Sequence, residues 1–319
     1  MGFERRLDSV EQIKDFFDSI ELSYYFDQNS DFVDLLKAKY RKSTKIELLT
    51  SLVNDIYLVH NTAENYAKND TLTYSTNRDS KFHNDLDRLK LRSEIKKCCV
   101  SYRRNKNDDA TSNALNRDGL GPTKGYLEFD NKAFLIIGGP ACGKSTYANI
   151  IADYYGAYLL DSDLIKRKFP EFNTKGPASA SLLHEESKKV YEDFLEDVVG
   201  SGVNIVTPIV GKRFDSLQES VDAFIDNDYK VYLILVHVNK AEATRRALKR
   251  YVKTERYVPL NYVIDICGNE SVASFFRMAC VYTKLSALDI DNTNKKGKIL
   301  FERGAAEIVN LLKKKKVIV

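Results

Sequence analysis

Residues 138–145 constrain this chain more than any other segment, because they read Gly-Gly-Pro-Ala-Cys-Gly-Lys-Ser. They fit the pattern G-x-x-x-x-G-K-[ST], in which glycines permit a tight loop whose backbone N–H groups point inward. The apolar run 133–137 before them predicts a buried parallel strand, and residues 146–153 after them predict a helix. A strand, a glycine-rich loop and a helix in this order predict a site for the phosphates of a nucleoside triphosphate.

Individual residues of this loop have distinct expected roles. Lys144 is expected to reach the β- and γ-phosphates of ATP, and the Ser145 hydroxyl is expected to hold Mg²⁺. The backbone N–H groups of the loop and of the first helical turn are expected to bind the other phosphate oxygens. The predicted nucleotide-binding residues are Gly138, Gly139, Pro140, Ala141, Cys142, Gly143, Lys144, Ser145 and Thr146.

The residues around and after the loop alternate between apolar and amphipathic segments. Strands are predicted at residues 133–137, 157–160, 203–207, 231–238 and 299–301. Helices are predicted at about residues 144–154, 178–199, 213–226, 240–252, 259–286 and 305–313. Strands joined by helices form right-handed crossovers, so the pattern predicts an α/β fold whose parallel sheet is covered by helices on both faces. Ligands of such sheets bind at the carboxyl ends of the strands.

Residues 1–106 show no such alternation and predict an all-helical N-terminal region. Apolar residues recur at helical spacing in four segments, at about residues 9–20, 29–40, 44–66 and 81–104. The polar stretch that follows predicts a linker. We therefore divide the chain into a helical region at 1–106, a linker at 107–125 and a phosphate-loop domain at 126–319.

Composition excludes several classes of protein. With 49 basic and 45 acidic side chains, the net charge is +4, which is too small to indicate nucleic acid or a membrane surface as a partner. No apolar run approaches the length of a membrane span, and the N-terminus has no apolar signal region, so we expect a cytoplasmic protein. The five cysteines have no zinc-ligand spacing and are expected to be free thiols.

Two carboxylates follow the second predicted strand, in the segment Asp161-Ser162-Asp163. At the carboxyl end of a strand beside the phosphate loop, such a pair suits a magnesium ligand and a general base for an attacking hydroxyl. An acidic helix N-cap explains the same residues without chemistry.

Basic residues gather in and after the helix predicted at 240–252, among them Arg250 and then Arg256. In a segment that closes over a phosphoryl-transfer site, such residues stabilise the charge of the migrating group. A solvated basic helix face is the alternative reading. The fourth predicted strand, 231–238, lacks the acidic residue that motor ATPases place at a strand end, so the pattern favours a small-molecule kinase over a mechanical ATPase.

The order of motifs in this chain resembles the zeta-toxin family of P-loop kinases. The motifs are the phosphate loop, the segment from Asp161-Ser-Asp163 to Pro170, the entry Gly202-Val-Asn204 to the third strand, and the pair Arg250 and Arg256. Members of that family phosphorylate sugar nucleotides such as UDP-N-acetylglucosamine. The resemblance covers about residues 126–285 and implies that Asp163 activates the acceptor hydroxyl while Lys144 holds the phosphates. It also implies that Arg250 and Arg256 contact the transferred phosphate. Asp161 is the expected magnesium ligand beside Ser145.

Two positions depart from the family pattern on the acceptor side. The family has Glu-Gly-Thr after the third strand, where this chain has Thr207-Pro208-Ile209-Val210, and a histidine where this chain has Phe169. The resemblance therefore implies a small-molecule phosphoryl acceptor, a sugar nucleotide or another nucleotide, without naming it. Related kinases also act on the ribose hydroxyl of NAD. Toxin kinases are normally restrained by an antitoxin, so an inhibitory partner protein is a further implication.

Two other functions fit parts of the sequence. A nucleotide-dependent binding switch would use the helical region 1–106 to engage a partner and the phosphate loop only to sense ATP. A polynucleotide 5′-OH kinase would use the basic segment 96–106 for RNA, although a solvated helix end explains that segment as well.

Overall fold

The computed structural model describes residues 7–105, 118–266 and 270–319. The N-terminal helices are α1 (Val10–Ser19), α2 (Leu22–Gln28), α3 (Ser30–Tyr40), α4 (Lys45–Lys68) and α5 (Asp85–Ser101), with short 3₁₀ turns η1 (Ser75–Asn77) and η2 (Ser80–Phe82). Helix α4 begins at a capping box. The Thr44 hydroxyl accepts from the Glu47 backbone N–H, and the Glu47 carboxylate accepts from the Thr44 backbone N–H. The predicted all-helical N-terminal region is confirmed for the described residues.

The second part of the chain builds one six-stranded sheet. Its strands are β1 (Lys132–Ile137), β2 (Tyr158–Leu159), β3 (Ile205–Ile209), β4 (Lys230–His237), β5 (Ser286–Asp291) and β6 (Lys298–Arg303). The strand order is β2-β3-β1-β4-β5-β6. All neighbours pair in parallel except β5 and β6, which pair antiparallel. The predicted α/β fold with a mostly parallel sheet is confirmed.

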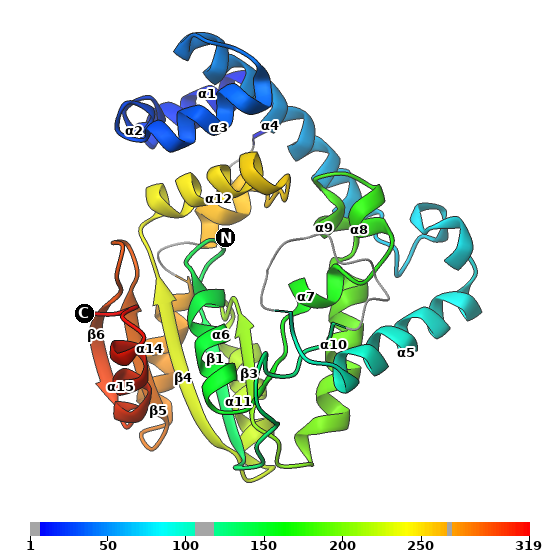
Figure 1. Ribbon diagram of the computed structural model, residues 1–319, viewed down its shortest axis with the longest axis vertical. Coiled ribbons are helices and arrows are strands. Elements are labelled where there is room, and N and C mark those ends of the chain that lie inside the picture. Colours follow the sequence, from blue (N-terminus) through cyan, green and yellow to red (C-terminus); the bar gives the residue numbers. More distant parts are fainter. Residues whose placement is uncertain (1–6, 106–117, 267–269) are drawn as a thin grey trace.

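Helices cover both faces of this sheet (Figure 1). They are α6 (Lys144–Tyr154), α7 (Ser162–Lys166), α8 (Glu171–Thr174), α9 (Ser179–Leu182), α10 (His184–Val199), α11 (Phe214–Ile225), α12 (Lys240–Thr254), α13 (Leu260–Ile266), α14 (Glu270–Val281) and α15 (Ala306–Lys314). Alternate residues of the central strand β1 enter different cores, as the pleat requires. Leu135 belongs to the core with α10, α11 and α14, whereas Phe134 and Ile136 belong to the core with α6 and α15.

Helix α5 packs into the core of the sheet rather than into a separate N-terminal core. Its residues Leu91, Ile95 and Cys99 are fully buried in the cluster that also holds Leu135. The division at 1–106, 107–125 and 126–319 stays a prediction, and most of the predicted linker lies outside the described residues.

One strand differs from the sequence-based expectation. The helix predicted at 259–286 is wrong at its end, because α14 stops at Val281 and β5 begins at Ser286. The segment carries two aspartates, which disfavour a strand on propensity alone. Asp289 is nonetheless buried, with its carboxylate 3.1 Å from the ring of His237 on the adjacent strand. A contact between two titratable side chains thus replaces the apolar contact that a buried strand normally makes.

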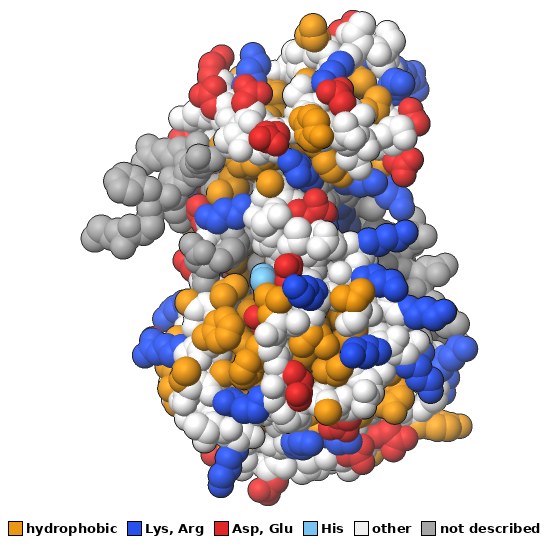
Figure 2. All heavy atoms as spheres, turned by 90° about the vertical axis from the view of Figure 1, so that its left-hand side faces the viewer, with side chains coloured by type: hydrophobic (Ala, Val, Ile, Leu, Met, Phe, Trp, Pro, Cys, Tyr) orange, Lys and Arg blue, Asp and Glu red, His pale blue; other side chains and the backbone are white. Residues whose placement is uncertain are grey.

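The outer edge of the sheet is partly apolar. Strand β6 ends the strand order, and Figure 2 shows hydrophobic side chains gathered among Lys and Arg on the face at this side of the molecule. The exposed large apolar side chains of β6 and α14 are Leu300, Phe276 and Val281. None of the helices in the described ranges has the length and hydropathy that crossing a bilayer requires.

Candidate active site

The phosphate loop connects β1 to α6, as predicted. Gly138 has φ +149°, and a Cβ there would lie 2.0 Å from the carbonyl oxygen of Val236. Gly143 is the N-cap of α6 with φ +93°, and a Cβ added there would lie 2.5 Å from Nδ2 of Asn292. Both positions therefore require glycine, for backbone conformation and for space. Gly138 and Gly139 are buried, while Ser145 and Thr146 are exposed at the first turn of α6.

Lys144 lies across its own loop. Its Nζ donates to the carbonyl oxygens of Gly138 and Gly139, both at 2.7 Å. The ammonium group is thereby placed over the concave side of the loop, where phosphate oxygens bind in such motifs. The loop residues Pro140, Ala141 and Cys142 complete the turn, with Ala141 at φ +59°.

A residue that the sequence analysis did not single out holds the loop from outside. Asn292, directly after β5, donates from Nδ2 to the carbonyl oxygen of Cys142 at 2.7 Å and accepts from the Tyr147 hydroxyl at 2.9 Å. Arg246 of α12 donates to the carbonyl oxygen of Asn292 at 2.9 Å. The signal was missed because β5 itself was not predicted, so nothing placed Asn292 at the carboxyl edge of the sheet.

Asp161 and Asp163 follow β2, at the same edge of the sheet as the phosphate loop. Asp161 is the N-cap of α7, and its Oδ1 accepts from the backbone N–H of Asp163 at 2.9 Å. The capping alternative is therefore true of Asp161, and it leaves the Asp163 side chain, 47% exposed, available to a ligand. Burial and the charge of Asp163 raise the pKa of Asp161 to about 6.

Asp163 lies in a strongly positive environment. Lys166, one helical turn further along α7, places its Nζ 2.9 Å from Oδ1 of Asp163 and is itself nearly buried. Lys166 first, and then Arg256 and Arg250, hold the pKa of Asp163 far below its usual range. The structure thus brings the two predicted arginines within electrostatic reach of the predicted base. Lys166 was missed, although an Asp–Lys spacing of three residues on a helix was a usable signal.

Arg250 and Arg256 reach this place from α12 and from the segment that follows it. The Arg256 guanidinium also lies over the ring of Phe172, 5.7 Å from its centroid. Both side chains are half-buried. The arrangement joins a phosphate-binding loop, a fixed anion and two cations at one edge of a parallel sheet, which is the chemistry that phosphoryl transfer uses.

The position that departs from the family pattern has a partner of its own. Thr207 in β3 is buried, and its Oγ1 lies 2.8 Å from the hydroxyl of Tyr191 in α10. Burial raises the pKa of Tyr191 to about 12, so this hydroxyl stays neutral. A neutral pair therefore occupies this position, which lies inside β3 and not after it, since the strand runs to Ile209.

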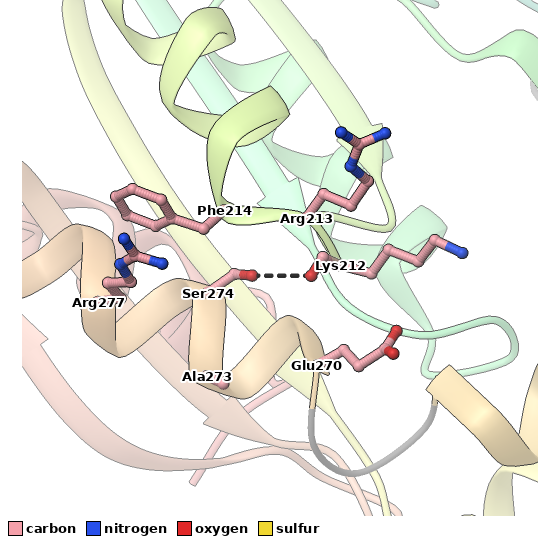
Figure 3. A pocket seen from close by; sticks show the side chains of 7 residues that line it. All are labelled: Lys212, Arg213, Phe214, Glu270, Ala273, Ser274 and Arg277. Atoms are coloured by element: carbon pink, nitrogen blue, oxygen red, sulfur yellow. Dashed lines mark hydrogen bonds between the residues drawn. The ribbon is translucent and has the colours of Figure 1, made fainter. Parts of the chain in front are cut away.

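A cavity of about 520 Å³ lies beyond the end of β3. Its lining residues are Lys212, Arg213, Phe214, Glu270, Ala273, Ser274 and Arg277 (Figure 3). Arg277 stacks on the ring of Phe214, 3.7 Å from its centroid, and Ser274 donates to the carbonyl oxygen of Lys212 at 3.0 Å. In Figure 3 the Lys212 and Arg213 side chains extend away from the Phe214–Arg277 stack. Since the cations do not converge on one point, we assign no ligand to this cavity.

The pair of His237 and Asp289 predicts a pH-dependent stability. The Asp289 carboxylate beside His237 raises the pKa of the ring above its ordinary 6.5, against burial, and Asp291 and Cys142 add to the rise. A raised pKa contributes stability that is present below 6.5 and is lost as the pH rises through the folded-state value. His237→Gln should therefore lower the unfolding temperature most at about pH 5 and least at about pH 9. Thermal unfolding of both proteins across this range checks it, and a difference independent of pH would contradict it.

Comparison with known proteins agrees with the class that this fold defines, a P-loop kinase-type α/β protein. The family model described as Zeta toxin matches residues 123–297, more than half of the chain. The chain belongs to the zeta toxin family.

Solved structures with similar folds are distant in sequence. The PezAT chromosomal toxin–antitoxin system of Streptococcus pneumoniae matches at 12% identity with TM-score 0.49, over 75% of this chain and 88% of that chain. The AvrRxo1-ORF1:AvrRxo1-ORF2 complex matches at 14% identity with TM-score 0.47, over 72% of this chain and 73% of that chain. A putative kinase from Chloroflexus aurantiacus matches at 14% identity with TM-score 0.38, over 60% of this chain and 99% of that chain. A comparison with curated protein sequences found no match.

Proposed function

We propose that this protein is an ATP- and Mg²⁺-dependent kinase that transfers the γ-phosphate to a hydroxyl of a small molecule, a sugar nucleotide or another nucleotide. The observation that carries the proposal is Asp163, a half-exposed carboxylate in the field of Arg250 and Arg256. It follows β2, which is separated from the phosphate-loop strand β1 only by β3. Two strand spacings amount to about 10 Å, which leaves room for a terminal phosphate and an acceptor hydroxyl between the loop and Asp163.

The loop supplies the anchor. The backbone N–H groups of residues 138–146 bind phosphate oxygens at the start of α6, where the helix dipole favours negative charge. The ammonium group of Lys144 exchanges the carbonyl oxygens of Gly138 and Gly139 for the β- and γ-phosphate oxygens. These contacts fix the terminal phosphorus relative to the edge of the sheet.

Asp163 orients the acceptor. Because Lys166 keeps its pKa low, the carboxylate is an anion at every physiological pH, and it accepts a hydrogen bond from the attacking hydroxyl. The transition state of phosphoryl transfer is loose, so holding the hydroxyl in line matters more than removing its proton early. Arg250 and Arg256 neutralise the negative charge of the migrating group.

Ser145 and Asp161 offer the oxygen ligands that Mg²⁺ prefers. Asp161 is suited to this role because it is a carboxylate at the strand end with only one described backbone hydrogen bond, from Asp163. Magnesium takes most of its other ligands from water and phosphates, so two protein oxygens are sufficient. Bound there, the ion would offset the negative charge of the phosphates.

Membership of the zeta toxin family supports a partner as well as an activity. We propose an inhibitory antitoxin or similar partner protein, in line with the family's general behaviour. We also propose that residues 126–319 carry the transferase, with residues 1–106 as a helical region packed onto it.

Growth of cells that express the chain under an inducible promoter tests the toxicity on which the antitoxin proposal depends.

Lys144→Met tests the nucleotide site. The substitution removes the charged donor but keeps a side chain of similar length, so the affinity for ATP should fall roughly tenfold to hundredfold. Lys249→Met, a lysine of α12, serves as the control and should leave the affinity unchanged. Isothermal titration with ATP and Mg²⁺ measures both, and equal affinities for Lys144→Met and the wild type would refute the anchor.

Product analysis separates the kinase from a binding switch. A switch binds ATP and yields no phosphorylated small molecule, whereas a kinase transfers the γ-phosphate of ATP to an acceptor and releases ADP. The same titrated samples, incubated with a pool of metabolites, therefore decide between the two functions.

A further inference from the structure

The N-terminal helices pack against residues 250–256, which carry Arg250 and Arg256 and are called the arginine segment. Figure 1 shows α1 to α4 stacked against α12 on the side away from the sheet. A single apolar core joins the two parts: buried residues of α1 to α4 share it with Leu248, Tyr251, Val252, Tyr257, Leu260 and Ile264. The backbone that carries Arg250 and Arg256 is thus packed against residues 7–68.

Polar contacts add specific anchors on α12. Arg245 donates to the carbonyl oxygen of Ile20 at 2.8 Å, and its guanidinium lies 5.1 Å from the ring centroid of Tyr25. At the other end of the helix, Lys39 pairs with Glu255 at 3.2 Å. The N-terminal region therefore contacts α12 within its first half, at Arg245, and at its C-cap, Glu255.

The best-buried anchor lies directly beside Arg256. The hydroxyl of Tyr257 is 2.9 Å from Nδ1 of His60 in α4, and both side chains are 2% exposed. The same hydroxyl accepts from the backbone N–H of Leu260 at 3.4 Å. Its proton is then free to be donated to His60, which accepts at Nδ1 as a neutral ring. Burial lowers the pKa of His60, in keeping with this neutral form, although Glu64 opposes the shift.

The backbone of Tyr257 is fixed as well. Its N–H donates to the carbonyl oxygen of Pro177 at 3.1 Å, which ties the segment to the loop before α9. The residue two positions earlier, Glu255, takes the left-handed conformation at φ +56°. Arg256 therefore lies between a fixed turn and a fully anchored ring, with its own guanidinium over Phe172.

We propose that Tyr257 and His60 are positioning residues for Arg256: the buried hydroxyl–imidazole bond fixes the arginine that meets the transferred phosphoryl group. The proposal rests on the proposed function for the role of Arg256. It assigns a task to the N-terminal helices, because His60 reaches the site from a segment that lies outside the matched residues 123–297. An arginine displaced by about 1 Å loses roughly tenfold to hundredfold of its effect on the transition state.

The test uses the full chain and needs no acceptor. ADP with Mg²⁺ and aluminium fluoride mimics the transferring phosphoryl group, whereas ADP alone reports only on the phosphate loop. Tyr257→Phe should weaken binding of the aluminium fluoride complex roughly tenfold or more and change the affinity for ADP less than about twofold. Tyr229→Phe is the matched control, since its buried hydroxyl donates to the carbonyl oxygen of Val203 at 3.0 Å, outside the arginine segment.

Two further variants separate positioning from general destabilisation. In an Arg256→Ala background, Tyr257→Phe should cause no additional loss, because the residue that it positions is gone. His60→Asn keeps an acceptor near the place of Nδ1 and should bind the aluminium fluoride complex more tightly than His60→Leu does. Additive losses in the double variant would overturn the proposal.

The outcomes also distinguish this proposal from the proposed function. If the wild-type protein binds the aluminium fluoride complex no more tightly than ADP, the proposed contact of Arg256 with the transferring group is refuted, and the positioning role with it. If the wild type binds it tightly and Arg256→Ala weakens it while Tyr257→Phe does not, only the positioning role is refuted.

Discussion

Asp163→Asn is expected to lower phosphoryl transfer by roughly 10²- to 10⁴-fold while leaving the affinity for ATP within a few-fold. The amide keeps the size of the side chain but loses the negative charge that orients the attacking hydroxyl and balances Lys166, Arg250 and Arg256. ATP binds at a different segment, after β1, so its affinity should depend little on this carboxylate. Turnover with the identified acceptor and titration with ATP measure the two quantities separately.

Asp215→Asn is the matched control for this prediction. Asp215 lies in the first turn of α11, which follows β3 as α7 follows β2, and it is exposed. The same substitution there changes the net charge equally and should leave turnover unchanged. Normal turnover by Asp163→Asn would show that the base is another residue.

Arg88→Met should lower the free energy of unfolding by about 3 to 5 kcal/mol, the usual cost of removing one partner from a buried ion pair. Arg88 of α5 is fully buried between two fully buried carboxylates, Glu171 and Glu186, and bonds both at 2.7 Å. Without it, Glu171 keeps one described donor, the backbone N–H of Asp79. The midpoint of urea denaturation measures the loss.

Lys90→Met on the same helix is the control for this prediction. Lys90 forms an exposed pair with Asp87 at 3.5 Å, and such surface pairs contribute little. Its removal should change the free energy of unfolding by less than about 0.5 kcal/mol. Equal effects of the two substitutions would mean that the buried cluster does not join α5 to the segment after α7.

Local pattern was sufficient for the parts of the fold that repeat a known physical rule. The apolar runs of β1 and β4 and the glycines at 138 and 143 follow from burial and from the needs of a tight loop, so their positions were predicted correctly. Strand β5 was not predicted, because its two aspartates have a low propensity for strands. Asp289 becomes compatible with burial only through His237, which is 52 residues earlier, and no local pattern reveals that pairing.

The site shows the same division between local and distant information. Asp161 and Asp163 were predicted as site residues because they directly follow a strand. Lys166 could have been predicted in the same way, since it is one helical turn from Asp163. The role of His60 had no such signal. Its partner Tyr257 is 197 residues away, and only the folding of the N-terminal helices against α12 brings the two rings together.

The most direct test of the account is to identify the phosphorylated product. The full-length protein is incubated with γ-labelled ATP, Mg²⁺ and a metabolite extract, and the products are analysed by mass spectrometry. The account predicts a labelled small molecule that gains one phosphoryl group on a hydroxyl, with the wild-type protein and not with Asp163→Asn. If ATP binds and no small molecule acquires the label, the protein is not the kinase proposed here.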